Sequence, residues 1–277
     1  MDTIIGLGNA GCNIADMFAQ YSQYLTYKLD VGLEKTKTTF PLDMHQKIEN
    51  YEEKTPNLQY FFRGLRGDIL FVVGGGGKVS SASLAILKHL KNKCNINILY
   101  IKPEPTLLNE TQFKLEKMVY NVLQEYTRSG VFSKMFIISN EEVENLLGNL
   151  TVKNYYNKIN EMVVSAIHMI NIFKNSISIN DTFCELPIGA RIITIGMVDL
   201  ENEENKMFFS LDNVSDMVYY CAYNKRKIES DSSLMKKIKT MINKQKENGV
   251  RVTYGIFETD YKQDYIYCMN YASVIQN

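Results

Sequence analysis

The sequence contains 277 residues, of which 45% are hydrophobic, and its 31 basic and 31 acidic side chains give a formal net charge of +0. This length allows one large or two modest domains, and the neutral charge argues against a general nucleic-acid-binding protein. The odd number of scattered cysteines, without a C-x-x-C pair, indicates a reducing compartment and argues against a disulfide framework or a zinc site. With no signal peptide or membrane-spanning apolar run evident, we expect a cytoplasmic protein without direct membrane or nucleic-acid contacts.

The chain begins with a short strand, a glycine-rich turn and a helix. Residues 3–18 read TIIGLGNAGCNIADMF, in which the apolar pair Ile4 and Ile5 leads into the glycines. Glycine lets a backbone approach a ligand closely, and a helix N-terminus offers unpaired N–H groups and the positive end of a dipole. We therefore predict a phosphate-binding turn, the alternative being a tight turn without a ligand. Its candidate ligand-binding residues are Gly6, Gly8, Asn9, Ala10, Gly11, Cys12 and Asn13.

The same turn also fits a second class of ligand. Residues 6–11 match the G-x-G-x-x-G dinucleotide fingerprint, and Asp30 lies near the offset of the acid that binds the ribose. Taken alone, the turn would also predict an NAD(P)-dependent enzyme, so the rest of the chain must distinguish the two.

From residue 24 to residue 138 the chain alternates apolar strands and amphipathic helices. The run at 68–73 is almost entirely apolar, which is typical of a strand covered on both faces. The alternation predicts right-handed βαβ units around a parallel sheet, whose ligands lie at the carboxyl ends of the strands. We expect strands at 24–29, 68–73, 96–101 and 135–138, helices at 82–90 and 113–126, and a polar loop at 31–66 with some helix near 42–51. The predicted apolar face of the helix at 113–126 consists of Leu115, Met118, Val119, Val122, Leu123 and Tyr126.

The longest helical pattern covers residues 150–174, and the character of the chain changes after it. Its broad apolar stripe predicts a helix buried between two layers or domains. We expect a loop at 175–185, strands or a strand–helix mixture at 191–198, 207–211 and 217–223, a helix at Leu234–Lys246, and an antiparallel pair of strands at 250–258 and 265–271. The sequence therefore predicts an α/β fold with a Rossmann-like domain at 1–174, including the central helix, and a smaller α+β domain at 175–277.

A second glycine-rich turn follows the apolar strand at 68–73. It is not a Walker A loop, because Val72 stands where that loop needs its first glycine and Val79 where it needs Ser or Thr. Its backbone N–H groups could still form an anion nest, the alternative being a flexible turn without a ligand. The candidate phosphate-binding residues of this turn are Gly74, Gly75, Gly76, Gly77, Lys78, Val79 and Ser80.

Two glycine turns on one sheet resemble the tubulin/FtsZ superfamily rather than the dinucleotide fold. In that family the first turn ends in an Asn, as at Asn13, and the second reads GGGTGTG, against GGGKVSS at 75–81 here. Lys78 stands in place of the first Thr, and Val79 and Ser81 replace two glycines. The resemblance therefore implies an altered phosphate geometry, in which the charge of Lys78 replaces hydroxyl contacts and hydrolysis is weak.

Further motifs follow in the order of that family. ILYIKP at 98–103 resembles the strand and proline ahead of the sugar-contacting loop, and Glu110 and Lys114 resemble the Glu and Arg of that loop. IISNE at 137–141 resembles the strand that ends in Pro-Asn-Asp, with Asn140 as its Asn.

On the long helix, Tyr156 and Asn160 resemble the aromatic residue that stacks on guanine and the Asn that reads its edge. Their spacing of four puts both side chains on one helix face, as binding of a single base requires. The alternative is that Tyr156 is a core aromatic residue and Asn160 a solvated polar one.

INDTFCEL at 179–186 resembles the family's NxDxxD loop. Asn180 matches the Asn and Glu185 the final acid, while Asp181 comes one residue before the middle acid, where Thr182 stands. In the family this loop reaches the nucleotide of the next subunit and helps to position the attacking water. The resemblance therefore implies catalytic roles for Asn180, Asp181 and Glu185, the alternative being acids on a solvated loop.

The resemblance covers roughly residues 1–198 and implies a GTPase that binds GTP or GDP with Mg²⁺, without a metal site built from protein ligands. It implies that the chain assembles with itself head to tail into filaments and that it is a divergent phage, plasmid or bacterial relative of the family. It also implies an adaptor or cargo protein, which the sequence does not identify. Two alternatives stay open, namely the NAD(P)-dependent enzyme and a non-hydrolysing assembly or capping protein on the same fold.

Overall fold

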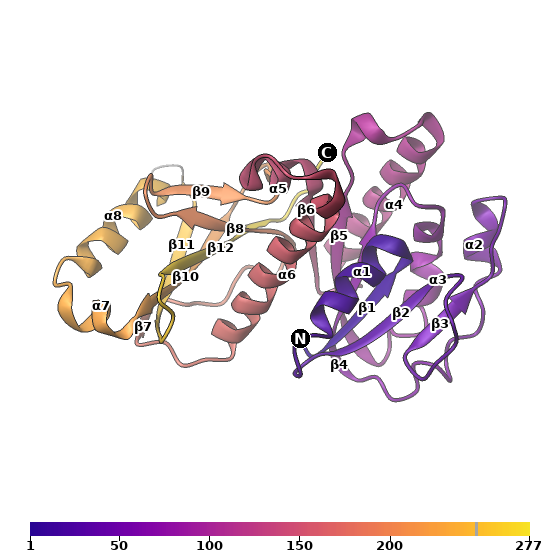
Figure 1. Cartoon of the computed structure of the whole chain (residues 1–277), viewed down its shortest axis with the longest axis horizontal. Coiled ribbons are helices and arrows are strands. Elements are labelled where there is room, and N and C mark those ends of the chain that lie inside the picture. The colour runs from indigo at the N-terminus through magenta and orange to yellow at the C-terminus, as the bar shows by residue number, and fades with distance from the viewer. Residues whose placement is uncertain (247–248) are drawn as a thin grey trace. The chain divides into compact units, whose positions relative to one another are not determined.

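The computed structural model describes residues 1–246 and 249–277, which form two compact units (Figure 1). Unit 1 contains Met1–Val164 and Asn277, and unit 2 contains Ser165–Gln276. The division falls within helix α6 (Tyr155–Lys174), whereas the predicted boundary follows residue 174. None of the described helices is long and apolar enough to cross a membrane.

Unit 1 is built on a sheet of parallel strands. They are β1 (Thr3–Leu7), β2 (Leu25–Val31), β3 (Thr39–Leu42), β4 (Gly67–Gly74), β5 (Cys94–Lys102) and β6 (Lys134–Ser139). Their order in space is β3-β2-β1-β4-β5-β6, and each neighbouring pair is parallel, as the sequence predicts. The direction of the strand order therefore reverses between β1 and β4.

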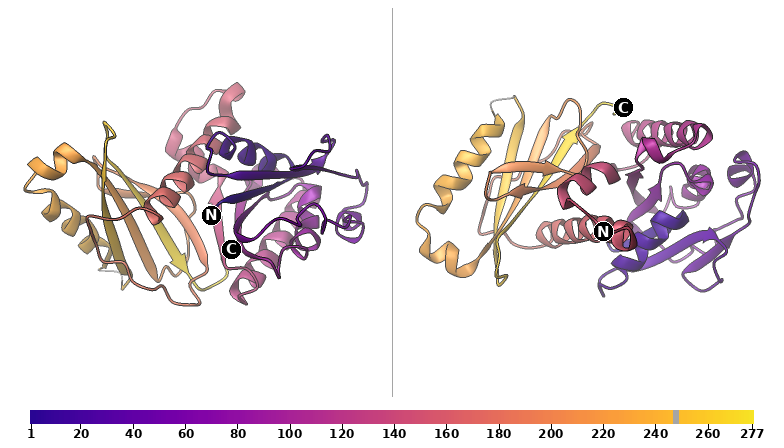
Figure 2. Two further views of the ribbon diagram at one scale, coloured as in Figure 1. Left: turned by 90° about the horizontal axis from the view of Figure 1, so that it is seen from below. Right: turned by 45° about the horizontal axis from the view of Figure 1, so that its top comes forward.

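Helices cover both faces of this sheet. They are α1 (Gly8–Phe18), α2 (Glu49–Glu53), α3 (Ser83–Leu87), α4 (Glu110–Arg128), α5 (Asn140–Leu147) and the first turns of α6, with 3-10 turns at Lys78–Ala82, Pro105–Leu107 and Val152–Asn154. Figure 2 shows α1 on one face of the sheet and α3 and α4 on the other. Residues 69–73 of β4 are accordingly at most 1% exposed.

Unit 1 differs from the prediction in four places. The loop expected at 31–66 contains β3, whose Pro41 obscures the strand pattern because proline is tolerated mainly on edge strands. The helix expected near 42–51 lies at Glu49–Glu53, and the one expected at 82–90 begins as the 3-10 turn at Lys78–Ala82. Helix α5 was not predicted; it starts where the Ser139 hydroxyl accepts a hydrogen bond from the Glu142 N–H at 3.3 Å.

Unit 2 has a mixed sheet with the order β8-β12-β10-β11-β7, and β9 pairs with β8. The strands are β7 (Asn180–Asp181), β8 (Ile192–Asp199), β9 (Glu204–Met207), β10 (Asp216–Asn224), β11 (Arg251–Thr259) and β12 (Tyr265–Ala272), and the helices are α7 (Lys225–Ser230) and α8 (Leu234–Lys246). Ile238 and Ile242 of α8 pack with buried residues of the sheet. Phe173, in the last turn of α6, packs against the ring of Phe257 with 4.9 Å between centroids.

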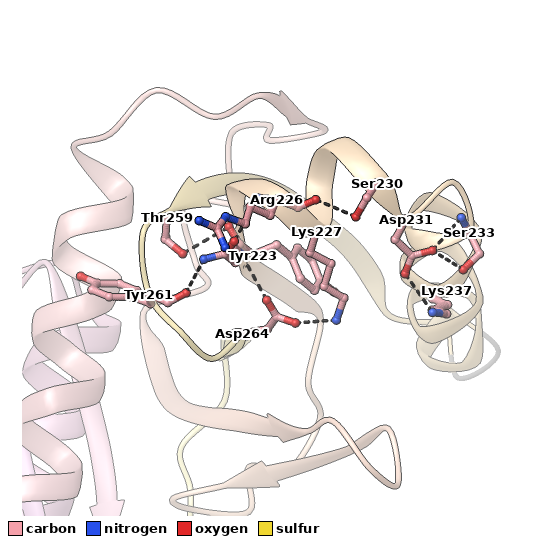
Figure 3. A network of polar contacts seen from close by, with 11 residues as sticks. Tyr223, Arg226, Lys227, Ser230, Asp231, Ser233, Lys237, Thr259, Tyr261 and Asp264 are labelled. Atoms are coloured by element: carbon pink, nitrogen blue, oxygen red, sulfur yellow. Dashed lines mark hydrogen bonds and ion pairs between the residues drawn. The ribbon is translucent and has the colours of Figure 1, made fainter.

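The predicted antiparallel pairing of the two last strands is wrong, because β10 lies between β11 and β12. The α7–α8 crossover returns the chain parallel to β10, and the turn after β11 then carries β12 to the other side of β10. Figure 3 shows the contacts that hold these connections, including the ion pair of Lys227 with Asp264. Of the strand expected at 207–211, only residue 207 lies in a strand, as the last residue of β9.

Replacing Gly6 by Ala should destabilise the protein. The added Cβ would lie 2.2 Å from the Gly11 carbonyl oxygen, so β1 and α1 would have to separate. We expect Gly6→Ala to lower the free energy of unfolding by about 2 kcal/mol or more in urea titrations followed by circular dichroism. Gly64→Ala is the control, because its Cβ would meet no described atom within 4 Å. Equal stabilities of the two variants would contradict this packing.

Candidate functional site

The two glycine turns meet at one edge of the unit 1 sheet. β1 and β4 are parallel neighbours in the register Leu7↔Val73, so both turns leave the sheet at the carboxyl ends of adjacent strands. A Cβ placed on Gly8 would lie 3.8 Å from Cβ of Val79. In open α/β sheets ligands bind where the strand order reverses, which is this edge. The structure thus brings together the two turns that the sequence predicts as one site.

The first turn opens the N-terminus of α1 to an anion. Gly8 has a φ of +70°, a conformation that favours glycine, and begins the helix. Among the described residues no side chain caps α1, and its first turn carries no acidic residue. Its leading N–H groups and the positive end of its dipole are therefore available to a negatively charged ligand. On the next turn Asn13 is exposed, and its Nδ2 lies 3.5 Å from Oδ1 of Asn9.

Cys12 faces the interior and not the open edge. Its Sγ lies 3.6 Å from the carbonyl oxygen of Gly6 and 3.7 Å from that of Leu29, and the side chain is buried. Burial, with the nearby charge of Asp30, raises the pKa of this thiol to about 12. Cys12 therefore belongs to the packing of the turn.

Part of the second turn is committed to bonds within the protein. The N–H of Gly75 donates to the carbonyl oxygen of Ile101 at 2.9 Å, which continues the pairing of β4 with β5. The N–H and the hydroxyl of Ser80 both donate to the carbonyl oxygen of Gly77, at 2.9 and 2.6 Å. We therefore restrict the predicted anion contacts to the backbone N–H groups of residues 76–79. Gly76 itself has a φ of +78°.

The residues that depart from the GGGTGTG pattern hold a neighbouring segment. The ammonium group of Lys78 donates to the carbonyl oxygen of Gln46 at 3.4 Å. The hydroxyl of Ser81, with its single proton, lies within hydrogen-bond distance of the carbonyl oxygens of Ile48, at 3.1 Å, and Lys78, at 2.7 Å. In this structure Lys78 and Ser81 thus tether the segment at 46–48 to the second turn.

Helices α4 and α5 begin at the same edge of the sheet. Leu108, just before α4, would lie 3.1 Å from a Cβ on Gly76, so the start of α4 adjoins the second turn. On its first turn Glu110 and Lys114 are exposed and form an ion pair with each other. Asn140 is the first residue of α5 and follows directly on β6.

Tyr156 and Asn160 lie one turn apart at the start of α6. Tyr156 is 55% exposed and Asn160 only 7%, the reverse of a core aromatic residue beside a solvated polar one. The ring of Tyr155 stacks edge-on against Tyr156 at 4.9 Å, and its hydroxyl donates to Oε2 of Glu144 at 2.5 Å. These contacts fix the start of α6 against α5.

The predicted catalytic segment lies in unit 2. Asn180 and Asp181 form β7 on the edge of β11, and an oxygen of Asp181 accepts the N–H of Phe183 at 3.3 Å. Glu185 is exposed, and its carbonyl oxygen accepts a hydrogen bond from Nη2 of Arg251 at 3.1 Å. Of the two acids, Asp181 is used within its own loop, and Glu185 presents its carboxylate to solvent.

No protein-family model matches the sequence, and no curated protein matches it. Solved structures do match. GDP-form protofilaments of TubZ from Bacillus thuringiensis serovar israelensis give a TM-score of 0.72 at 17% identity, covering 99% of this chain and 86% of that one. An empty FtsZ dimer from M. jannaschii gives 0.70 at 10% identity, covering 98% and 87%. A GTPγS-bound protofilament of CetZ2 from Haloferax volcanii gives 0.65 at 13% identity, covering 98% and 92%.

The chain has the tubulin/FtsZ fold. This confirms the fold predicted from the order of the motifs, and at identities of 17% or less the similarity establishes the fold alone.

Sequence reasoning missed one group of residues that supports the second glycine turn. Tyr100 of β5 and Glu116 of α4 lie against Gly75, and the Tyr100 hydroxyl donates to Oε1 of Glu116 at 3.2 Å. Nζ of Lys102 lies 3.7 Å from the same oxygen. The sequence carries no usable signal for this group, because Glu116 and Lys117 both stand between buried apolar residues of α4, and only Glu116 is buried.

Cys12 should resist thiol reagents in the folded chain. At about pH 8 its buried thiol stays protonated and the thiolate is the reactive form, whereas Cys184 is exposed. A thiol-reactive dye should therefore label Cys184 in the native protein and Cys12 only after unfolding in urea, as read by peptide mass mapping. Cys184→Ser identifies the labelled site. Labelling of native Cys12 as fast as Cys184 would contradict the packing of the first turn.

Proposed function

We propose that this chain binds guanine nucleotides at the edge between β1 and β4 and assembles head to tail into filaments. The observation that carries the proposal is the meeting of two glycine turns at the point where the strand order reverses. The fold adds support, because matching structures include a GDP-form TubZ protofilament and a GTPγS-bound CetZ2 protofilament.

The phosphate chain would lie between the two turns. The N–H groups at the start of α1 and the backbone from Gly76 to Val79 would donate to its oxygens. Gly8 and Gly76 both have left-handed φ values. They support this role because glycine adopts such conformations readily and lets the backbone approach a ligand closely. Lys78 would add its charge after leaving the carbonyl of Gln46.

The nucleoside would lie toward α4, α5 and α6. Tyr156 offers an exposed ring for stacking, and Asn13, Asn140 and Asn160 offer amides for the edge of the base. Glu110 and Lys114, exposed at the start of α4, would contact the ribose.

Mg²⁺ would neutralise charge on the phosphate oxygens. Among residues 1–246 and 249–277, no group of three His, Cys, Asp or Glu side chains could hold a metal ion. We expect phosphate and water to supply most of its ligands, which is the usual mode of Mg²⁺ in nucleotide sites.

Hydrolysis would be completed by the next subunit. Glu185 is exposed on a segment that Arg251 and β11 hold in place, so its carboxylate could reach a neighbour's nucleotide and orient the attacking water. Asn180 and Asp181 would shape this segment through their bonds to Tyr254 and Phe183.

Two other functions have some support. Weak or absent hydrolysis, as in a capping or assembly protein, is favoured by the inward bonds of Lys78, Ser80 and Ser81. An NAD(P)-dependent enzyme is favoured by the strand order, which is also that of the dinucleotide fold, and by Asp30 near the end of β2. It leaves the second glycine turn and the segment at 180–185 without a role.

Guanine nucleotides should stabilise the chain against thermal unfolding, and NAD or ATP should not. A ligand at 100 times its Kd adds about 2.7 kcal/mol to stability. Tyr156→Ala should weaken GTP binding about tenfold, because stacking on one aromatic ring contributes roughly 1–3 kcal/mol. Tyr126→Ala removes another exposed ring as the control. Stabilisation by NAD alone would refute the proposal.

Glu185→Gln should slow phosphate release in polymer about a hundredfold, because a positioned carboxylate contributes at least that much to proton transfer. Filaments formed with GTP should then persist longer, as followed by light scattering and a phosphate assay. Glu201→Gln, an exposed acid elsewhere in unit 2, is the control. Turnover equal to that of the wild type would remove Glu185 from the mechanism.

A further inference from the structure

A buried carboxylate lies directly behind the second glycine turn. Glu116 of α4 is 5% exposed, and a Cβ on Gly75 would come within 2.8 Å of its Cγ. The same Cβ would lie 2.4 Å from the hydroxyl oxygen of Tyr100. Gly75 therefore has no room for a side chain, because α4 and β5 press against it at this point.

Lys102 accompanies this carboxylate. Its Nζ lies 3.7 Å from Oε1 of Glu116 and 3.9 Å from the centroid of the Tyr120 ring, and its side chain is largely buried. Tyr100 adds a hydrogen bond from its hydroxyl to the same oxygen at 3.2 Å. Burial, with the charge of Glu116, raises the pKa of Tyr100, so its hydroxyl remains a donor.

The ammonium group of Lys102 points to Glu116, although the residue stands at the edge of the sheet where the glycine turns lie. Lys102 is the last residue of β5 and follows Ile101, whose carbonyl oxygen binds the N–H of Gly75. A lysine at this edge could extend toward an anion in the site, yet its ammonium group turns back to Glu116 and Tyr120. A lone carboxylate behind the turn would repel phosphate groups, and charges interact more strongly at buried positions than in water.

We infer that Lys102 and Glu116 form a positioning pair that sets how strongly the second turn holds a phosphate chain. Glu116 keeps α4 packed against Gly75, and Lys102 cancels the negative charge that would otherwise oppose the phosphates. This inference rests on the proposed nucleotide function. It means that two residues outside the glycine turns make the affinity depend on the number of phosphates, whichever base the nucleotide carries.

The test compares the affinities of fluorescent GTP, GDP and guanosine for the full chain and its variants. Lys102→Met should weaken GTP binding about tenfold, GDP binding less, and guanosine binding not at all, since a tenfold change is about 1.4 kcal/mol. Glu116→Gln should tighten GTP binding, and the double variant should return close to the wild-type affinity. Lys117→Met is the matched control, because Lys117 is an exposed lysine next to Glu116 on α4. Thermal unfolding without ligand checks that each variant is folded.

The dependence on phosphate number separates this role from a purely structural one. A loss of affinity that is equal for GTP and guanosine, or unchanged affinities in all variants of a wild type that binds GTP, would overturn the inference alone. A wild-type chain that binds neither GTP nor GDP would overturn both the inference and the proposed function.

Discussion

The close approach of backbone segments at the start of the chain determines the geometry of unit 1. Gly6 faces the carbonyl of Gly11, and a Cβ on Gly11 would lie 2.4 Å from the carbonyl oxygen of Val72. Only residues without side chains let α1 rest against both β1 and β4 in this way. Because α1 is held there, its N-terminus opens next to the second turn, and the two turns share one edge of the sheet.

The second turn depends on a different kind of support. Gly75 is bonded to β5 and lies against Glu116, so α4 and β5 fix the position of this part of the turn. Its outer part is tied to the segment at 46–48 through Lys78 and Ser81. The site therefore combines a rigid first turn with a second turn whose position is set by charged and hydroxyl side chains.

The parallel sheet and the shared edge of the turns could be predicted because both follow from local patterns, namely apolar strands, glycine turns and amphipathic helices. The pairing of β11 with β12 was wrong, since neighbours in sequence favour a hairpin and only the folded sheet shows that β10 lies between them. On α4, Met118 and Tyr126 were expected inside and are exposed, while Glu116 and Tyr120 are buried. Neither the direction of the Ser80 hydroxyl nor burial of a charge can be read from residue spacing.

The central claim is that both glycine turns hold a single nucleotide. A structure of the chain with a slowly hydrolysed GTP analogue tests it most directly. The account predicts phosphate oxygens within hydrogen-bond distance of backbone N–H groups at the start of α1 and, in the same site, between Gly76 and Val79. A nucleotide that contacts only the first turn, with its ribose toward Asp30, would contradict it.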